Sequence, residues 1–253
     1  MKLSKADLIY EKKGIFGDEK KFKDSNHRLK LMKDIFKKLP LKPEAILDIG
    51  CGTGYFTNFL KENFPKAEVI GTDISKKALN LGKEKYKNVE FRFANSEASL
   101  PFKNKYFDLI VSAETIPCIK DTDTFLSEIS RVSKKGASLM LTTPNLSSWL
   151  NRLLIATGKP LFYYEPSFRK TLPLLKIGKY TFPNRDLPPT GLLRVFNSEI
   201  LSKLLREYDF NIIKVYGVSL LSLKILKPLD LFFCQIPNLA TGIILLAVKK
   251  ETA

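Results

Sequence analysis

Short apolar runs alternate with amphipathic segments along the middle of the chain. The apolar runs have the length of buried strands and end near glycine or polar residues; they cover residues 45–49, 68–73, 89–94, 107–113 and 137–142. Segments between several of them carry apolar residues at helical spacing, at residues 55–64, 75–85 and 122–132. This alternation predicts an α/β fold, in which helices cover both faces of a parallel, doubly wound sheet.

Residues 145–193 interrupt the alternation. They are rich in aromatic, proline and basic residues, which predicts a helical or irregular insertion that forms a lid over the carboxyl ends of the fourth and fifth strands. The alternation then resumes with a helix capped by Asn197, a strand at residues 210–216 and a final strand at residues 242–249. We therefore expect four parts: a basic helical N-terminal arm (1–43), the first part of the α/β core (44–144), the lid insertion (145–193) and the completion of the core (194–253).

Charge is unevenly distributed over these four parts. The chain has a formal net charge of +16, of which the N-terminal arm carries +7 and residues 145–195, which contain the insertion, carry +6, whereas residues 44–144 carry only +1. Basic charge concentrated in two segments indicates an anionic surface or an anionic substrate that they meet. A general enrichment in lysine would explain the same charge equally well.

The remaining composition predicts a cytoplasmic location. The three cysteines are too scattered for a disulfide framework, and the N-terminus lacks the apolar segment of a secretory signal. The two most apolar stretches, residues 217–237 and 239–248, are interrupted by charges and proline or are shorter than the roughly 20 residues that a membrane span needs. Peripheral contact with a membrane, through the basic segments, remains an open alternative.

A glycine-rich turn follows the first predicted strand. It reads Asp48-Ile49-Gly50-Cys51-Gly52-Thr53-Gly54. Glycines let the backbone approach a ligand closely, and the N-terminus of the next helix offers unpaired amides. The spacing G-x-G-x-G does not match the nicotinamide fingerprint G-x-G-x-x-G. Asp73 stands about 20 residues beyond the turn, at the end of the second strand, where a carboxylate can accept hydrogen bonds from both ribose hydroxyls.

Five segments in order resemble the successive motifs of class I S-adenosylmethionine-dependent methyltransferases, in the broad branch that includes the quinone-biosynthesis enzymes. The segments are LDIGCGTGYFT (47–57), GTDIS (71–75), ANSEASLPF (94–102), FDLIVS (107–112) and EISRVSKKGASLMLTTPN (128–145). The resemblance implies a Rossmann-like, mostly parallel sheet of seven strands whose last strand, at residues 242–249, is antiparallel. It also implies S-adenosyl-L-methionine as the cofactor.

By this resemblance, the turn surrounds the methionine part of the cofactor and Asp73 binds the ribose. Ile74 packs against the adenine, while Asn95 and Ser96 lie at its edge, where relatives usually carry Asp and Ala; an Asn still offers an acceptor to the adenine amine. The full set of implied cofactor-binding residues is Asp48, Gly50, Cys51, Gly52, Thr53, Gly54, Asp73, Ile74, Asn95, Ser96 and Ala113.

Three residues are candidates for a catalytic role: His27, Glu114 and Tyr163. The sulfonium methyl is already activated, so a general base is needed only if the acceptor must lose a proton. His27 is the sole histidine, on a predicted helix that could cover the cofactor pocket, although a surface histidine on a basic helix is the simpler interpretation. Glu114 would lie beside the sulfonium and the acceptor by the resemblance.

No metal site is expected. In some quinone O-methyltransferases, acidic and histidine residues after the fourth strand bind a divalent metal, whereas here Pro117 and Cys118 follow Glu114 at the later positions. The resemblance therefore predicts transfer without a metal ion.

The insertion bears on the methyl acceptor. Its aromatic residues, such as Trp149 and Phe162, are interleaved with basic residues, namely Arg152, Lys159, Arg169 and Lys170. Such a mixture can bind a lipophilic anion, lie in a membrane interface, stack on exposed bases or simply pack the insertion onto the sheet. We expect methylation of a small apolar or amphipathic acceptor at oxygen or carbon. One alternative is an RNA or tRNA methyltransferase, although the sequence contains no recognisable RNA-binding module. The other alternative is a non-catalytic cofactor-binding protein.

Overall fold

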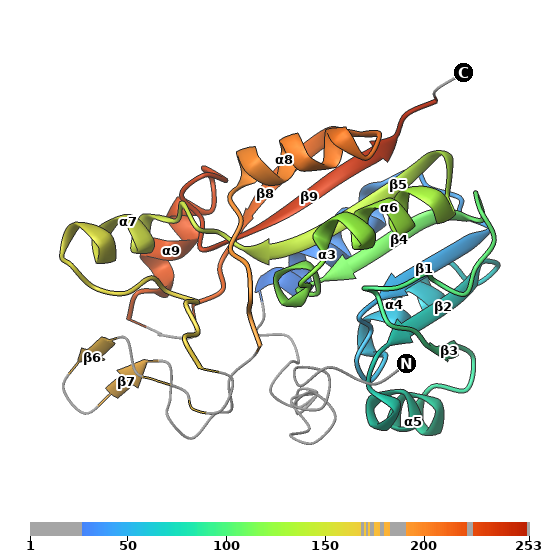
Figure 1. Ribbon diagram of the computed structural model, residues 1–253, viewed down its shortest axis with the longest axis horizontal. Helices are drawn as coiled ribbons and strands as arrows, with labels where there is room; N and C mark the ends of the chain where they lie inside the picture. Colours follow the sequence, from blue (N-terminus) through green and yellow to red (C-terminus); the bar gives the residue numbers. More distant parts are fainter. Residues whose placement is uncertain are drawn as a thin grey trace.

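The computed structural model describes residues 27–167, 170, 172, 175–177, 180–182, 191–221 and 225–251. A seven-stranded sheet has the order β3-β2-β1-β4-β5-β9-β8 (Figure 1). The strands are β1 (Ala45–Ile49), β2 (Glu68–Asp73), β3 (Glu90–Phe93), β4 (Phe107–Ala113), β5 (Ser133–Pro144), β8 (Phe210–Val218) and β9 (Gly242–Lys249). Only β9 runs against its neighbours, β5 and β8, which confirms the predicted class and the antiparallel last strand.

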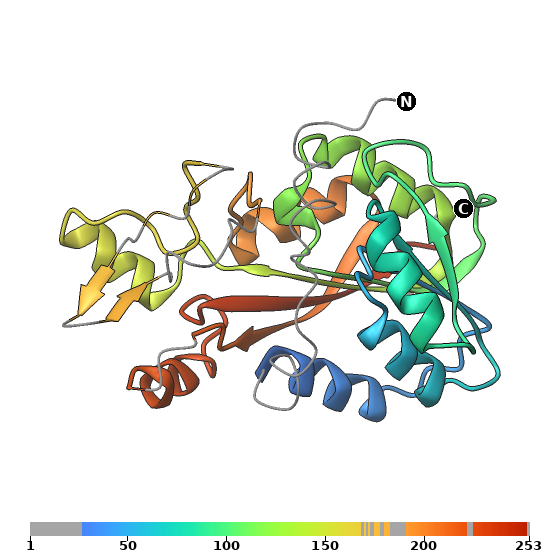
Figure 2. The same cartoon turned by 90° about the horizontal axis from the view of Figure 1, so that it is seen from below.

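Helices cover both faces of this sheet. They are α3 (His27–Lys38), α4 (Tyr55–Asn63), α5 (Lys76–Lys85), α6 (Thr122–Val132), α7 (Trp149–Ala156), α8 (Ser198–Glu207) and α9 (Lys227–Phe233), with a 3₁₀ turn η1 (Ile116–Cys118). Figure 2 shows α6 and α8 on one face and α3 on the other. The predicted caps are confirmed, because Ser75 accepts from the Ala78 amide and Asn197 from the Ile200 amide.

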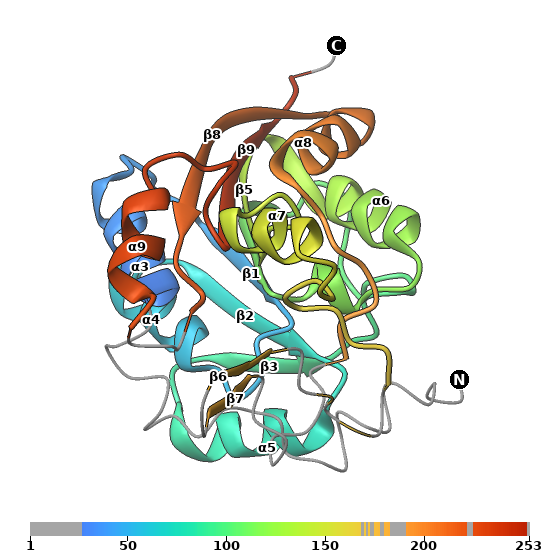
Figure 3. The same ribbon diagram turned by 90° about the vertical axis from the view of Figure 1, so that its left-hand side faces the viewer.

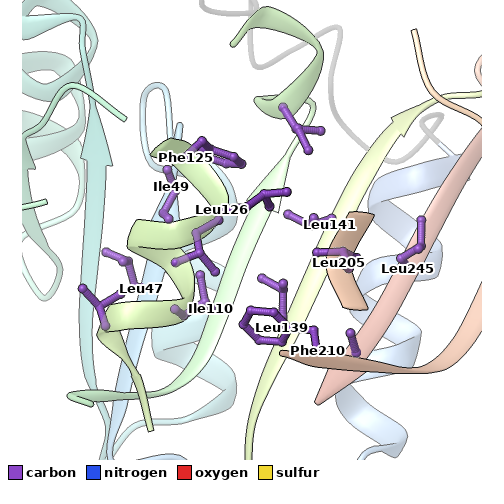
Figure 4. Packing of buried hydrophobic residues seen from close by; sticks show 14 of the residues in the cluster. Leu47, Ile49, Ile110, Phe125, Leu126, Leu139, Leu141, Leu205, Phe210 and Leu245 are labelled. Carbon is purple, nitrogen blue, oxygen red and sulfur yellow. The ribbon is translucent and has the colours of Figure 1, made fainter. Parts of the chain in front are cut away.

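Both faces of the central strands are buried, which explains their unbroken apolar runs. Ile110 packs with α6 and α8, as Figure 4 shows for Phe125, Leu126 and Leu205. Leu109, the preceding residue, belongs to the opposite cluster with α3 and α4. A strand buried on both sides has no solvent face and hence no polar alternation.

The structure differs from the predicted elements in several places, among them β3, which covers Glu90–Phe93 rather than residues 89–94. β5 begins at Ser133 rather than at residue 137, and β8 extends to Val218 rather than ending at residue 216, because pairing with β9 continues to Gly242. Helix α9 was not predicted at all.

The two ends of the segment between β5 and α8 lie side by side at the edge of the core. Asn145 and Phe196 form a bridge, and the Leu146 amide donates to the Phe196 carbonyl at 2.7 Å. The segment holds α7 and a hairpin of β6 (Leu175–Ile177) and β7 (Tyr180–Phe182). Figures 1 and 3 show α7 and α9 together at the end of the molecule toward which β5 points.

Candidate active site

The turn between β1 and α4 depends on three glycines. Gly50, Gly52 and Gly54 have φ of +75°, +56° and +80°, the left-handed region that disfavours side chains. A Cβ on Gly50 would lie 2.0 Å from Thr115 Oγ1, and one on Gly54 would lie 2.3 Å from the Phe91 ring. Glycine is therefore required here by backbone conformation and, at Gly50 and Gly54, also by space.

The turn is held against the end of β2. The amides of Gly50 and Cys51 both donate to the Thr72 carbonyl, at 2.8 and 3.0 Å. Asp73 accepts from the Gly52 amide at 2.9 Å through Oδ2 and from the Ser75 amide at 2.8 Å through Oδ1. A carboxylate offers about four acceptor positions, so these two bonds leave acceptor capacity for a ligand.

Asp48 is a second buried acid at the same turn. Thr57 Oγ1 donates to its Oδ2 at 2.7 Å. Burial raises the pKa of Asp48 to about 7, with a further contribution from Asp73, whose own pKa burial also raises. Burial raises the pKa of the Cys51 thiol as well, so this thiol stays protonated. Two buried acids make the turn a place where a cationic group is favoured.

The loops after β2 and β3 bring three more predicted residues together. Ile74 is half-buried directly after Asp73, and the Ala94 amide donates to the Asp73 carbonyl at 3.2 Å. Asn95 and Ser96 are half-buried beyond this contact. The Asn95 side chain accepts from the Glu97 amide at 2.9 Å, so part of its acceptor capacity is used within the loop.

Glu114 lies just after Ala113, at the end of β4, in a left-handed conformation with φ of +59°. Its Oε1 forms an ion pair with Arg28 Nη1 at 2.8 Å and accepts from Thr142 Oγ1 at 2.9 Å. Thr115 Oγ1 donates to the Ile49 carbonyl at 3.0 Å. These bonds join the carboxyl ends of β1, β4 and β5 to the start of α3.

Three of these partners were not predicted: Arg28, Thr57 and Thr115. Thr57 is part of the predicted turn motif, and its spacing from Asp48 could have suggested the bond. Arg28 adjoins His27, but nothing in the pattern separates it from the other 41 Lys and Arg residues. Its contact with Glu114 joins residues that are 86 positions apart and depends on tertiary structure.

His27 and Tyr163 both contact the segment that follows β8. His27 Nδ1 accepts from the Ser219 amide at 3.0 Å, and burial, with the Lys227 charge, lowers the pKa of His27. Tyr163 donates its hydroxyl proton to the Leu220 carbonyl at 3.1 Å, and burial, with the Glu114 charge, raises the pKa of Tyr163 well above its usual value. The structure thus gives both side chains backbone partners rather than a free proton-accepting position.

The part of the chain that the structure describes holds no group of three His, Cys, Asp or Glu residues that could bind a metal ion. In the same residues, no helix is long and apolar enough to cross a membrane. The predicted N-terminal arm before residue 27 and Arg169 lie outside the described residues.

The sheet order, the antiparallel last strand and the glycine turn beside a buried carboxylate define a class I S-adenosylmethionine-dependent methyltransferase. The family model described as a methyltransferase domain matches residues 41–167, and the chain belongs to this family. Membership implies S-adenosylmethionine as the methyl donor.

Individual relatives agree with this assignment. A demethylmenaquinone methyltransferase of Bacteroides fragilis is 38% identical over 195 residues, which cover 71% of this chain and 77% of the relative. A malonyl-[acyl-carrier protein] O-methyltransferase of Hahella chejuensis is 33% identical over 102 residues, 40% of this chain and 37% of the relative. A solved S-adenosylmethionine-dependent methyltransferase of Thermotoga maritima has the same fold, with a TM-score of 0.61 and 20% identity over 97% of this chain and 100% of that one.

Proposed function

We propose that this enzyme transfers the methyl group of S-adenosylmethionine to oxygen or carbon of a small apolar or amphipathic acceptor. The observation that carries the proposal is the turn of three left-handed glycines beside Asp48 and Asp73, at the carboxyl ends of β1 and β2. Ligands bind at this edge of open α/β sheets. The relative with the greater coverage is named for demethylmenaquinone and the other for malonyl-[acyl-carrier protein]; the first name supports an apolar acceptor.

The cofactor residues are proposed on the fit between the turn and a positively charged ligand. When bound, the cofactor supplies a methyl group already activated by a sulfonium. The turn, including Cys51 and Thr53, would enclose its methionine part, and the buried acids would offset its positive charges. Asp73 would bind the ribose, Ile74, Asn95 and Ser96 the adenine, and Ala113 would flank the sulfonium.

We assign Glu114 as the acidic group nearest the acceptor. Arg28 and Thr142 hold its carboxylate in one orientation, and positioning alone can supply several kcal/mol of the barrier for a displacement between aligned groups. His27 and Tyr163 hold the segment after β8 against α3 and the insertion. In this arrangement both side chains would orient that segment.

The test is a transfer assay with methyl-labelled cofactor and three acceptors: a short-chain quinol, a malonyl thioester and bulk transfer RNA. We expect label in a small acceptor. Asp73→Ala should weaken cofactor binding by about 1.5 to 3 kcal/mol in calorimetry, the range for hydrogen bonds to a charged group. Glu199→Ala removes an exposed acid that pairs with Lys203 on α8, and it should bind cofactor as the wild type does.

Two results would contradict the proposal. Label found in RNA and in neither small acceptor would assign the enzyme to the nucleic-acid class. Unchanged cofactor affinity in a folded Asp73→Ala variant would remove Asp73 from the site.

A further inference from the structure

Helix α9 has its polarity reversed relative to an ordinary surface helix. Its one buried side chain is Asp230, which is fully buried, whereas Leu229, Leu231 and Phe232 are 44%, 38% and 61% exposed. Ile236, in the turn after the helix, is 51% exposed. Surface helices usually bury their apolar side and expose their charges, so this arrangement needs a cause.

Contacts of Asp230 and Phe233 with the rest of the protein hold α9 in this orientation. Asp230 Oδ1 accepts from Trp149 Nε1 and Oδ2 accepts from Thr241 Oγ1, each at 2.8 Å. Phe233 stacks on Trp149 with ring centroids 5.4 Å apart. Rotating α9 to bury its apolar side would break the bond from Trp149 and the closer bond of the buried Thr241 hydroxyl, which costs free energy because a buried donor loses its best acceptor. The helix is therefore fixed with its apolar side outward.

Helix α7, which carries Trp149, adds to the same end of the molecule (Figure 3). Leu153 and Ile155 are 54% and 60% exposed, and Arg152 and Lys159 are exposed beside them. We call residues 145–164 and 225–240, which hold α7 and α9, the tip surface. The stack of Trp149 on Phe233 places the two helices side by side, and exposed apolar side chains gathered at one end of a folded protein mark an interaction site.

The charge of the tip surface identifies the partner. Residues 145–164 and 225–240 contain a single carboxylate, Asp230, and it is buried. The tip surface thus presents leucine, isoleucine and phenylalanine with basic residues and no exposed acid. This combination suits the interface of a bilayer that contains anionic lipids, where apolar side chains enter the headgroup boundary and Lys and Arg meet the lipid charge.

We propose that the tip surface docks this enzyme on an anionic phospholipid bilayer. The segment after β8 runs from the contacts of His27 and Tyr163 to α9, so docking would bring the bilayer close to the acceptor side of the site. This purpose rests on the proposed function, whereas the docking itself does not. The acceptors consistent with it are those that partition into a bilayer.

The experiment measures binding of the full chain to vesicles by sedimentation, without cofactor or acceptor. Vesicles of phosphatidylcholine with phosphatidylglycerol are compared with pure phosphatidylcholine. We expect binding to the anionic vesicles that weakens as salt rises from about 50 to about 300 mM, since the screening length shortens. Because no methyl transfer is involved, failure here leaves the proposed function untouched.

Matched variants locate the surface. Leu229→Ser with Phe232→Ser should lower binding roughly tenfold or more, because the two apolar side chains that would enter the headgroup boundary are replaced by polar ones. The control pair, Ile200→Ser with Ile213→Ser, removes side chains that are 54% and 59% exposed on α8 and β8, and it should bind as the wild type does. Thermal denaturation and cofactor calorimetry establish that both pairs are folded.

Two outcomes would overturn the proposal. One is a wild-type protein that does not bind anionic vesicles, including the case in which ultracentrifugation shows a dimer that the Leu229 and Phe232 variants dissociate. The other is equal vesicle binding by the two variant pairs.

Discussion

At the scale of single residues, the glycine turn is the most constrained part of the site. Gly54 combines a left-handed backbone with the closely packed Phe91 ring, which is itself buried. Both requirements follow from local geometry, which is why the turn could be predicted from its glycines and their spacing. The partners that fill the space, Phe91 on β3 and Thr115 at the start of η1, come from distant parts of the chain and could not be predicted.

Gly54→Ala should destabilise the protein more than Gly158→Ala. Gly158 has φ of +68° and no atom within 4 Å of an added Cβ, so its substitution costs only the left-handed conformation, about 1 to 2 kcal/mol. Gly54→Ala adds overpacking against Phe91, which should lower the unfolding free energy by about 1 to 3 kcal/mol more. Urea denaturation measures both. Equal losses would show that the Phe91 ring moves aside without cost.

Asp48 should make stability depend on pH. Its folded pKa of about 7 exceeds the usual aspartate pKa of 3.8, so the folded state holds the proton more tightly than the unfolded state does. The contribution of this residue is therefore fully present below about pH 4 and is lost as pH rises toward 7. Asp48→Asn, which keeps an acceptor for Thr57, should remove this part of the dependence.

The measurement is the difference in unfolding free energy between wild type and Asp48→Asn at several pH values. Taking the difference cancels the pH dependence that other groups contribute equally to both proteins. One such group is Glu128, whose pKa is lowered by its bond to Arg131 and whose contribution has the opposite sign. The unfolding free energy of the variant should rise relative to that of the wild type as pH increases from 4 to 7. A constant difference would mean that Asp48 ionises normally in the folded protein.

At the scale of elements, the predictable helices and strands are those whose pattern agrees with their surroundings. Helix α6 was predicted at its observed bounds, because Leu126, Ile129 and Val132 recur on one face and all are buried. Helix α9 was missed since its buried position carries an acid and its apolar positions face outward. The partners that cause this reversal, Trp149 and Thr241, are 81 and 11 residues from Asp230.

Asp230→Ala should therefore loosen α9 and lower global stability. It removes the acceptor of Trp149 Nε1 and the closer acceptor of Thr241 Oγ1, at about 1 to 3 kcal/mol for the buried hydroxyl. Asp230→Asn retains one acceptor oxygen and should cost less. Chemical denaturation gives the global loss, and hydrogen exchange at 227–240 gives the local one. Asp123→Ala, at an exposed acid on α6, is the control, and a loss of the same size there would contradict a special role for Asp230.

At the scale of the whole molecule, the arrangement of the sheet could be predicted from the order of the sequence motifs. The identity of the methyl acceptor could not. Part of the charge that suggested an anionic partner, +2 in residues 1–26 and +4 in residues 168–190, lies mostly outside the described residues. The exposed apolar side chains of α7 and α9 are an independent observation in favour of the proposed anionic bilayer. Their exposure could not be predicted from the sequence, because it depends on the burial of Asp230, which determines the side of α9 that faces outward.

Because the turn joins β1, β2 and β4, a ligand bound there should stabilise the whole core. At a cofactor concentration about 100 times its dissociation constant, binding to the folded state adds about 2.7 kcal/mol. For a domain of this size that corresponds to a rise in Tm of roughly 5 to 10 °C. Differential scanning fluorimetry with S-adenosylmethionine and its demethylated product should show this rise, and Asp73→Ala should reduce it. A nicotinamide dinucleotide is the negative control, since the G-x-G-x-G turn does not match its fingerprint. An equal rise with the dinucleotide would show that the turn binds any adenine nucleotide and does not select for the methyl donor.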